Sequence, residues 1–325
     1  MRNSNDLIRR LSKNGRNKHQ MMKIGKQTIM QGDCTQILLG DAVPECDLVI
    51  ADPPYWKVVG EKWDYQWRTE NDYVNWCNEW IKLIYKKLRV GGTFYLFGYF
   101  RMLVLLVPYL QEVGFSLRQQ IIIDKGLKAV AGRATKNYKM FPNTTESILF
   151  LVKDNIPFSR KLLKERQSEL RLSSKKINEA LGVKSNGGGM WSIYTGKNIC
   201  EQFPTRELWD RLQEVLQFQF DYDKIVQTFN PQMGLNDVWN DIDFYREKRY
   251  HPTQKPLKLI RRLIAASSNE GNTVLDPFAG CGTTAIASEQ MNRCSFSIEV
   301  NGHYIDTIKA RYAEECCSLF PPAIL

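Results

Sequence analysis

The sequence has no apolar run that approaches the ~20 residues needed to cross a bilayer, and its first residues are polar and basic without the apolar core of a signal peptide. Its eight cysteines form no Cys-x-x-Cys pair and have no nearby histidine at metal-ligand spacing. These absences argue against a membrane protein and against structural zinc. We therefore expect a cytoplasmic protein that holds no metal.

Acidic residues are also in short supply, because 35 Asp and Glu stand against 45 Lys and Arg. The formal net charge is +10 and the pI is near 9.1. Such a balance suits a polyanionic partner, since Lys and Arg neutralise nucleic-acid phosphates. Many soluble proteins are modestly basic, so the charge alone is weak evidence. At 325 residues the chain can bury one full α/β core and carry one further small region.

The tetrapeptide Asp52-Pro53-Pro54-Tyr55 directly follows the apolar run 47–51, which we expect to be a buried strand. Ligands bind at the carboxyl ends of strands in open α/β sheets. A carboxylate, two prolines that stiffen the backbone and expose a carbonyl, and one aromatic face are suited to hold a flipped nucleobase and its exocyclic amine. For this motif alone, an ordinary loop after a buried strand is the alternative.

A second motif, residues 273–284, has the pattern of a strand, a glycine turn and a helix. Gly280 and Gly282 allow the backbone to approach a ligand closely. Glu299 ends another apolar run about twenty residues later, where a nucleotide-binding βαβ unit has the acid that holds ribose hydroxyls. The triple-glycine pattern of dinucleotide folds is missing. This argues against NAD and favours a ligand without a pyrophosphate.

Both motifs, together with His251-Pro252-Thr253-Gln254-Lys255-Pro256, resemble the S-adenosylmethionine-dependent DNA amino-methyltransferases of bacterial and phage modification systems. The catalytic motif comes first, a variable segment next and the glycine loop last, which resembles the permuted β class. The resemblance covers roughly residues 26–153 and 236–314. It implies S-adenosylmethionine as the cofactor and double-stranded DNA as the partner, without a metal. It also allows a homodimer and a cognate restriction endonuclease.

The resemblance implies a role for each motif residue. The Asp52 carboxylate and the Pro53 carbonyl would accept the two hydrogens of the target amine, while Tyr55 would stack on the base. Asp276 would hold the ammonium group of the cofactor, and Glu299 its ribose. The other expected cofactor contacts come from a strand end, the glycine loop and the segment before it: Asp33, which would accept from the adenine amine, Phe278, Gly280 and Gly282, and Thr253 and Lys255, which would meet the methionine carboxylate.

Aspartate at the first motif position resembles the adenine-N6 enzymes, whereas serine is more usual in the cytosine-N4 enzymes. We therefore expect methylation of adenine N6, with cytosine N4 as the alternative. An RNA or protein methyltransferase and an inactive DNA-binding regulator are further alternatives. The long basic insertion between the motifs argues against an RNA or protein substrate. The intact motif residues argue against an inactive regulator.

We expect four segments: a basic N-terminal arm (1–25), a catalytic half (26–154), a target-recognition region (155–235) and a cofactor-binding half (236–325). The resemblance implies a Rossmann-like α/β fold. Its seven-stranded sheet, with helices on both faces, would have the order 3-2-1-4-5-7-6 with strand 7 antiparallel. The recognition region is expected to be small and mostly helical.

Local patterns give two further expectations. The apolar stripe over 76–88 predicts a helix that Gly91 and Gly92 end. In the recognition region, Ser174 is expected to cap a short helix. The candidate DNA contacts are basic residues in the first part of that region: Arg171, Lys175, Lys176 and Lys184.

Overall fold

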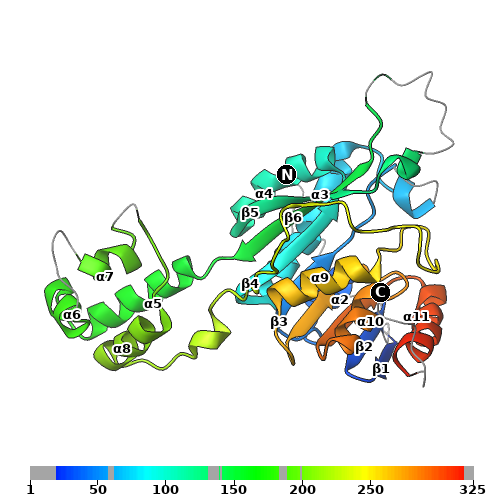
Figure 1. The fold of residues 1–325 in the computed structure, drawn as a ribbon. Coiled ribbons are helices and arrows are strands. Elements are labelled where there is room, and N and C mark those ends of the chain that lie inside the picture. The colour runs from blue at the N-terminus through cyan, green and yellow to red at the C-terminus, as the bar shows by residue number, and fades with distance from the viewer. Residues whose placement is uncertain are drawn as a thin grey trace, which may run out of the picture.

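The computed structural model describes residues 20–57, 62–130, 139, 141–182, 189–197 and 200–317. The larger part of the chain is a twisted sheet with helices on both faces, and a smaller helical lobe stands beside it (Figure 1). Residues 1–19, most of the predicted arm, lie outside the described residues. The last part of that arm is ordered instead as strand β1 (Met21–Ile24), because it pairs antiparallel with β2 (Gln27–Gln31).

The described sheet has nine strands in the order β1-β2-β9-β8-β3-β4-β6-β5-β7. The seven strands from β2 to β5 have the predicted order, with β6 antiparallel to both of its neighbours. The prediction omitted the two edge strands, since β7 (Val238–Trp239) is too short to show a periodic pattern. The other strands are β3 (Cys46–Ala51), β4 (Leu88–Gly98), β5 (Phe115–Asp124), β6 (Thr145–Lys153), β8 (Thr273–Asp276) and β9 (Cys294–Glu299).

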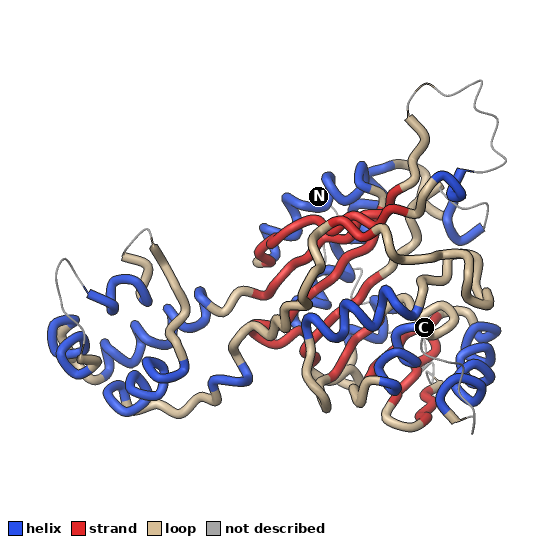
Figure 2. Tube along the Cα trace, in the orientation of Figure 1, coloured by secondary structure: helices blue, strands red, loops and turns tan. Residues whose placement is uncertain are grey.

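Central strands bury side chains on both faces, as expected for a sheet covered by helices on either side. In β3, Val49 and Ala51 enter one hydrophobic core and Leu48 and Ile50 enter the other. Figure 2 shows the helices on the two faces. The first core is closed by α2 (Cys34–Leu39), α3 (Glu70–Lys87) and α4 (Phe100–Val113), and the second by α9 (Leu257–Ser267) and α10 (Thr283–Gln290), with α11 (Gly302–Cys316) beside α10.

The predicted helix over 76–88 is α3, which begins and ends earlier than expected. Thr69 caps it reciprocally, because its hydroxyl accepts from the Asp72 N–H while the Asp72 carboxylate accepts from the Thr69 N–H. Gly91 does not end the helix but lies within β4 at a φ of +75°. A Cβ there would lie 2.3 Å from the carbonyl oxygen of Ile225. Glycine is required because the returning chain packs against it.

The lobe has its own hydrophobic core, separate from the two cores of the sheet. The lobe helices are α5 (Ile156–Glu169), α6 (Ser174–Ala180), α7 (Gly189–Tyr194) and α8 (Arg206–Leu216), and the buried apolar residues of the lobe are Leu163, Ile177, Leu181, Trp191, Tyr194, Leu212 and Leu216. Ser173, rather than the predicted Ser174, caps α6, because the Ser173 hydroxyl accepts from the Lys176 N–H.

Among the helices that the structure describes, none has both the length and the hydrophobicity of a membrane-spanning segment.

The chain that returns from the lobe is fastened to the sheet by Arg89. The Arg89 side chain is only 9% exposed and pairs with Asp47 at 2.7 Å. It also donates to the carbonyl of Val226 at 3.0 Å and to the hydroxyl of Thr228 at 3.1 Å. The other Asp47 oxygen accepts from the Thr273 N–H at 2.8 Å. One ion pair therefore joins β3, β4, β8 and the returning segment.

Arg89→Ala should lower the free energy of unfolding by about 3 kcal/mol, because it leaves the Asp47 carboxylate without its cation in a mostly buried place. Urea denaturation followed by circular dichroism measures the change. Arg206→Ala is the matched control, since its pair with Asp223 is exposed and should contribute little. An equal effect of the two substitutions would contradict the role of the buried pair.

Candidate active site

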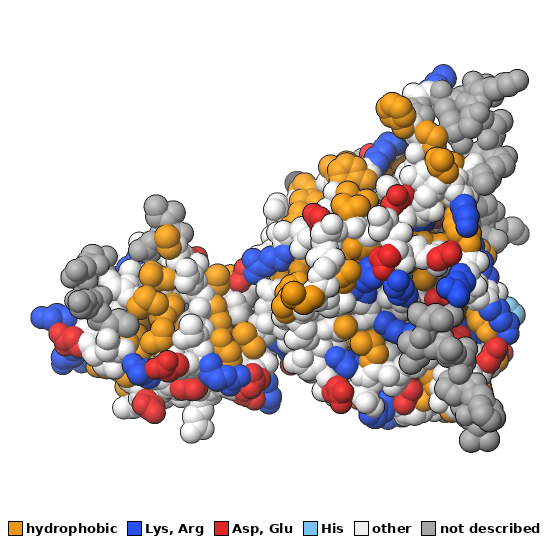
Figure 3. Space-filling model, in the orientation of Figure 1, with side chains coloured by type: hydrophobic (Ala, Val, Ile, Leu, Met, Phe, Trp, Pro, Cys, Tyr) orange, Lys and Arg blue, Asp and Glu red, His pale blue; other side chains and the backbone are white. Residues whose placement is uncertain are grey.

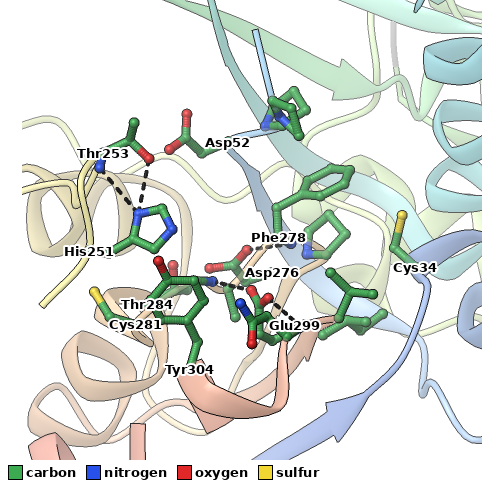
Figure 4. A pocket seen from close by; sticks show the side chains of 18 of the residues that line it. Cys34, Asp52, His251, Thr253, Asp276, Phe278, Cys281, Thr284, Glu299 and Tyr304 are labelled. Carbon is green, nitrogen blue, oxygen red and sulfur yellow. Dashed lines mark hydrogen bonds between the residues drawn. The ribbon is translucent and has the colours of Figure 1, made fainter. Parts of the chain in front are cut away.

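A cavity of about 370 Å³ opens at the carboxyl ends of β2, β9, β8 and β3 (Figure 4). These strands are parallel neighbours, so their ends meet at one edge of the sheet. Nearly all predicted catalytic and cofactor residues line this cavity: Asp33, Asp52, Pro53, Pro54, Tyr55, Thr253, Lys255, Asp276, Phe278, Gly280 and Glu299. The exception is Gly282, which caps α10 beside the cavity.

The glycine loop is held open by backbone conformations that favour glycine. Gly280 has a φ of +51° and Gly282 a φ of +80°. A Cβ on Gly282 would lie 2.8 Å from Ile308, so this glycine is needed for packing against α11. The Glu299 carboxylate accepts from the backbone N–H groups of Gly280 and Asn301, each at 2.8 Å. Glu299 thus fixes the loop to the end of β9.

Two buried carboxylates form the wall of the cavity, and both are shown in Figure 4. Burial raises the pKa of Asp276 to about 7, although the Phe278 N–H donates to this carboxylate at 3.0 Å. Burial also raises the pKa of Glu299. Amide hydrogen bonds compensate only part of the cost of burying an acid. A cationic ligand would therefore be stabilised at this wall.

Asp33 also lines the cavity, between the end of β2 and the start of α2. Its carboxylate is the N-cap of that helix and accepts from the N–H groups of Thr35 at 2.9 Å and of Gln36 at 3.2 Å. The predicted ligand contact would be an additional hydrogen bond, because each carboxylate oxygen has two lone pairs.

The Asp52 carboxylate belongs to an ionic cluster of Asp52, Tyr55, Glu146 and Lys255, called the Asp52 cluster below, in which Glu146 and Lys255 are buried and Asp52 and Tyr55 are half-buried. The Tyr55 hydroxyl lies 2.6 Å from Asp52 Oδ1 and 2.6 Å from Glu146 Oε1. The Lys255 Nζ lies 2.6 Å from Asp52 Oδ2 and 3.0 Å from Glu146 Oε1. Lys255, predicted to meet a cofactor carboxylate, is thus bonded to two side-chain carboxylates. An ammonium has three N–H donors, so this contact does not test the predicted one.

Burial and charge act in opposite directions within the Asp52 cluster. Burial raises the pKa of Asp52, and the charge of Glu146 raises it further. The nearby Lys255 ammonium lowers this pKa but offsets only part of the increase. Burial would also raise the pKa of Glu146, but Lys255 and Lys125 bring it below its ordinary value. Burial would lower the pKa of Lys255, yet the two carboxylates raise it. The Lys255 ammonium is therefore charged at neutral pH.

Glu146 and Lys125 were not predicted from the sequence. Glu146 lies near the start of β6 and is only 7% exposed. Lys125 follows β5 and approaches Glu146 at 3.6 Å. The available signal was a single acid separated only by Ser147 from the apolar run 148–152, because a carboxylate in a buried strand requires a partner.

An aromatic layer supports the backbone behind the catalytic motif. The Tyr73 hydroxyl donates to the Pro54 carbonyl at 2.8 Å, and the Trp56 ring stacks on the Tyr73 ring. The Trp56 indole N–H donates to the Trp67 carbonyl at 2.9 Å. Trp56 and Lys57 both have positive φ values, 58° and 61°, a conformation that non-glycine residues rarely adopt. The motif is thus followed by a strained turn, which the aromatic contacts stabilise.

His251 lines the cavity, although the sequence indicated no catalytic role for it. Its Nδ1 accepts from the Thr253 N–H at 3.2 Å, and its ring centroid lies 4.4 Å from that of Tyr304 (Figure 4). Burial, with the Lys255 charge as a second cause, lowers the pKa of His251 to about 4. The imidazole is therefore neutral at pH 7. His303 is exposed.

Three of the four candidate DNA contacts, Arg171, Lys175 and Lys176, are exposed on the lobe, away from the cavity. Lys184 lies outside the described residues. Lys175 is 3.9 Å from Glu179 in the same helix, an exposed pair that leaves the ammonium accessible. On the face seen in Figure 3, basic and acidic side chains are interspersed over the lobe.

A DNA adenine methyltransferase, YhdJ from Escherichia coli K12, is 27% identical over 291 residues, which cover 86% of this chain and 80% of that protein. Two solved structures share the fold. The M1.HpyAVI–SAM complex has a TM-score of 0.53 at 19% identity and covers 88% of this chain and 98% of its own. The cytosine-N4-specific PvuII DNA methyltransferase has a TM-score of 0.55 at 16% identity and covers 91% of this chain and 89% of its own.

A protein-family model described as DNA methylase matches residues 46–310. The match spans β3 with the motif that follows it, the lobe, and the glycine loop with Glu299. It therefore includes the cavity residues Asp52, Asp276 and Glu299. By this match over most of its length, the chain belongs to the DNA methylase family.

Proposed function

We propose that the chain transfers a methyl group from S-adenosylmethionine to the N6 amine of an adenine flipped out of double-stranded DNA. One observation carries the proposal: the Asp52 carboxylate lines the same cavity as the buried acids Asp276 and Glu299. An amine acceptor and a site for a cationic, ribose-containing ligand therefore share one space.

The residues of the cavity fit S-adenosylmethionine. Asp276 would bind its ammonium group and Glu299 its ribose hydroxyls, since both carboxylates accept hydrogen bonds from backbone amides and have lone pairs left. Asp33 would accept from its adenine amine. Phe278, the glycine loop and Thr253 complete the proposed contacts. When bound, this molecule supplies an electrophilic methyl group on a sulfonium.

The catalytic motif orients the target amine. A nucleobase amine is a poor nucleophile because its lone pair is delocalised into the ring. In the proposed complex Asp52 and the Pro53 carbonyl accept the two amine hydrogens, which favours a pyramidal nitrogen with an available lone pair. The neighbouring Pro54 carbonyl already accepts from Tyr73, so Pro53 is the prolyl acceptor in this proposal. Tyr55 would supply the aromatic face for the extruded base.

Adenine is the proposed base because aspartate begins the motif, and the adenine methyltransferase YhdJ is similar over 86% of the chain. Cytosine N4 is the alternative, because the cytosine-specific PvuII enzyme has the same fold. Both bases present an exocyclic amine to the same acceptors. The two readings differ only in the shape of the base pocket.

The lobe, with Arg171, Lys175, Lys176 and Lys184, is the proposed DNA-recognition region. Its hydrophobic core makes it a rigid unit, and its exposed basic side chains are suited to phosphate contact. A second copy of the chain and a cognate restriction endonuclease are further partners that the family resemblance allows. The proposed site of action is the bacterial cytoplasm, where both host and phage DNA are exposed to the enzyme.

Expression in a bacterial host without DNA methylation should introduce N6-methyladenine at one short recurring sequence. Single-molecule sequencing of the host genome measures base and site together. Asp52→Ala should abolish the modification, because the amine loses its carboxylate acceptor. N4-methylcytosine in its place would retain the mechanism and reverse the base, and an unmodified genome would contradict the proposed function.

Cofactor affinity should increase as the pH rises through about 7, because Asp276 ionises there and gains attraction for the ammonium group. Calorimetric titration with S-adenosylhomocysteine between pH 6 and 8 measures this. Asp276→Asn should weaken binding and remove the pH dependence. Glu247→Gln is the control, since burial also raises the pKa of Glu247 but it lies outside the cavity lining. An unchanged pH dependence in Asp276→Asn would refute the assignment.

Replacing Lys175 and Lys176 together with Ala should weaken DNA binding and reduce its salt slope by about one unit per lost phosphate contact. Fluorescence anisotropy with a labelled duplex over a series of salt concentrations measures both quantities. Lys82 and Lys86, exposed on α3 of the main body, form the matched control pair. If both double variants bind alike, the recognition surface lies elsewhere.

A further inference from the structure

We propose that Lys255 and Glu146 are positioning residues for Asp52: the Lys255 ammonium keeps the Asp52 carboxylate ionised, and Glu146 holds Lys255 and Tyr55 against it. The inference rests on the proposed function, since it concerns the acceptor of the target amine. It assigns to Lys255 a role toward Asp52, and it gives Glu146 a role in the reaction without contact with the substrate.

The contacts within the Asp52 cluster show how its hydrogens are shared. The Tyr55 hydroxyl has one hydrogen, yet it lies 2.6 Å from an oxygen of each carboxylate. That hydrogen can satisfy only one of the two acids at a time. The Lys255 ammonium reaches both acids and supplies the donors that the hydroxyl lacks. Asp52 keeps one lone pair on each oxygen for the substrate.

The charges in the Asp52 cluster make Lys255 the deciding group. Two carboxylates and one ammonium are in direct contact, and the side chains of Lys255 and Glu146 are 9% and 6% exposed. Two like charges in one buried site cannot both persist without a cation, so one of them takes a proton. Asp52 has the raised pKa and would be the acid that is protonated. A protonated Asp52 would be a weaker acceptor for the amine.

The other titratable groups around Asp52 come from several elements. Lys125, after β5, approaches the far oxygen of Glu146 at 3.6 Å. Asp276, at the end of β8, repels Asp52 electrostatically. His251 is neutral at pH 7 because its pKa is about 4. The Lys255 ammonium donates to Asp52 at 2.6 Å, so Lys255 controls the charge of Asp52 most directly.

A purely structural ion pair is the competing explanation. Burying three charges is an inefficient means of stabilisation, because the desolvation penalty offsets most of the attraction and apolar side chains would serve as well. The Asp52 cluster lies at the cavity wall, where an ionised Asp52 can accept a hydrogen bond from the target amine. The two explanations differ in their effect on the pH dependence of the reaction.

The test is the single-turnover rate of methyl transfer to DNA as a function of pH. For Lys255→Met, the acid limb of the profile should move up by about one pH unit or more, because the two acids then repel without a cation. For Glu146→Gln it should move down, because the ammonium then serves Asp52 alone. In the double variant the acid limb should return toward its position in the unchanged protein, since one charge of each sign is lost.

Two controls separate charge from packing. Lys255→Arg keeps the cation and should keep the acid limb in place. Lys258→Met removes a lysine of α9 that pairs with Asp241 on the surface, and it should leave the profile unchanged. If Lys255→Met does not fold, Glu146→Gln decides the question, because its nearly identical shape preserves packing and only the charge differs.

The proposal is overturned if Lys255→Met or Glu146→Gln lowers the rate without moving the acid limb, or if the acid limb of the double variant stays as high as that of Lys255→Met. Carbon-13 NMR of labelled aspartate gives a second readout that needs no turnover. The Asp52 carboxyl should titrate at higher pH in Lys255→Met than in the unchanged protein. If the unchanged protein methylates no DNA, the proposed function fails, whereas this titration still tests the link between Lys255 and Asp52.

Discussion

The ion pairs of the Lys255 ammonium with Asp52 and Glu146 are the interaction on which the active site depends. Its three members come from the end of β3, from β6 and from the segment before α9. Each element is fixed by the sheet or by a hydrophobic core, and the Lys255 ammonium joins the polar ends of all three at the cavity. The catalytic motif therefore has a defined charge and orientation before any ligand binds.

The surrounding fold makes such a contact stable. Parallel strands end at one edge, so the chain can bring acids from β3, β8 and β9 to one cavity while apolar side chains fill both faces of the sheet. Buried acids are tolerated there because amides, hydroxyls and one ammonium are directed at them. The strained turn after Tyr55 is held in turn by the aromatic layer of Trp56 and Tyr73.

Much of this architecture could be predicted from the sequence, for identifiable reasons. The apolar runs before Asp52 and Glu299 are strong strand signals, and the family resemblance supplied the strand order. Gly91 was wrongly expected to end the helix. A glycine is required there because the distant segment around Ile225 packs against it, and the local sequence pattern does not reveal that contact. Ser173 rather than Ser174 caps α6, a one-residue choice that depends on backbone conformation.

The partners of the active-site acids were less accessible to prediction. Lys255 was found as a motif residue, but its bond to Asp52 crosses 203 positions of the sequence. Glu146 belongs to no recognised motif, and its partners become apparent only from the strand pairing that brings β6 beside β4. Contacts of this kind follow from tertiary packing, which neither periodicity nor local spacing encodes.

The most direct measurement is a crystal structure of the chain with S-adenosylhomocysteine and a DNA duplex that contains its target site. We expect an extruded adenine whose N6 lies about 3 Å from an Asp52 oxygen and from the Pro53 carbonyl, with Lys255 still bonded to Asp52. A base that stays stacked in the duplex, or an amine bonded to other groups, would contradict it.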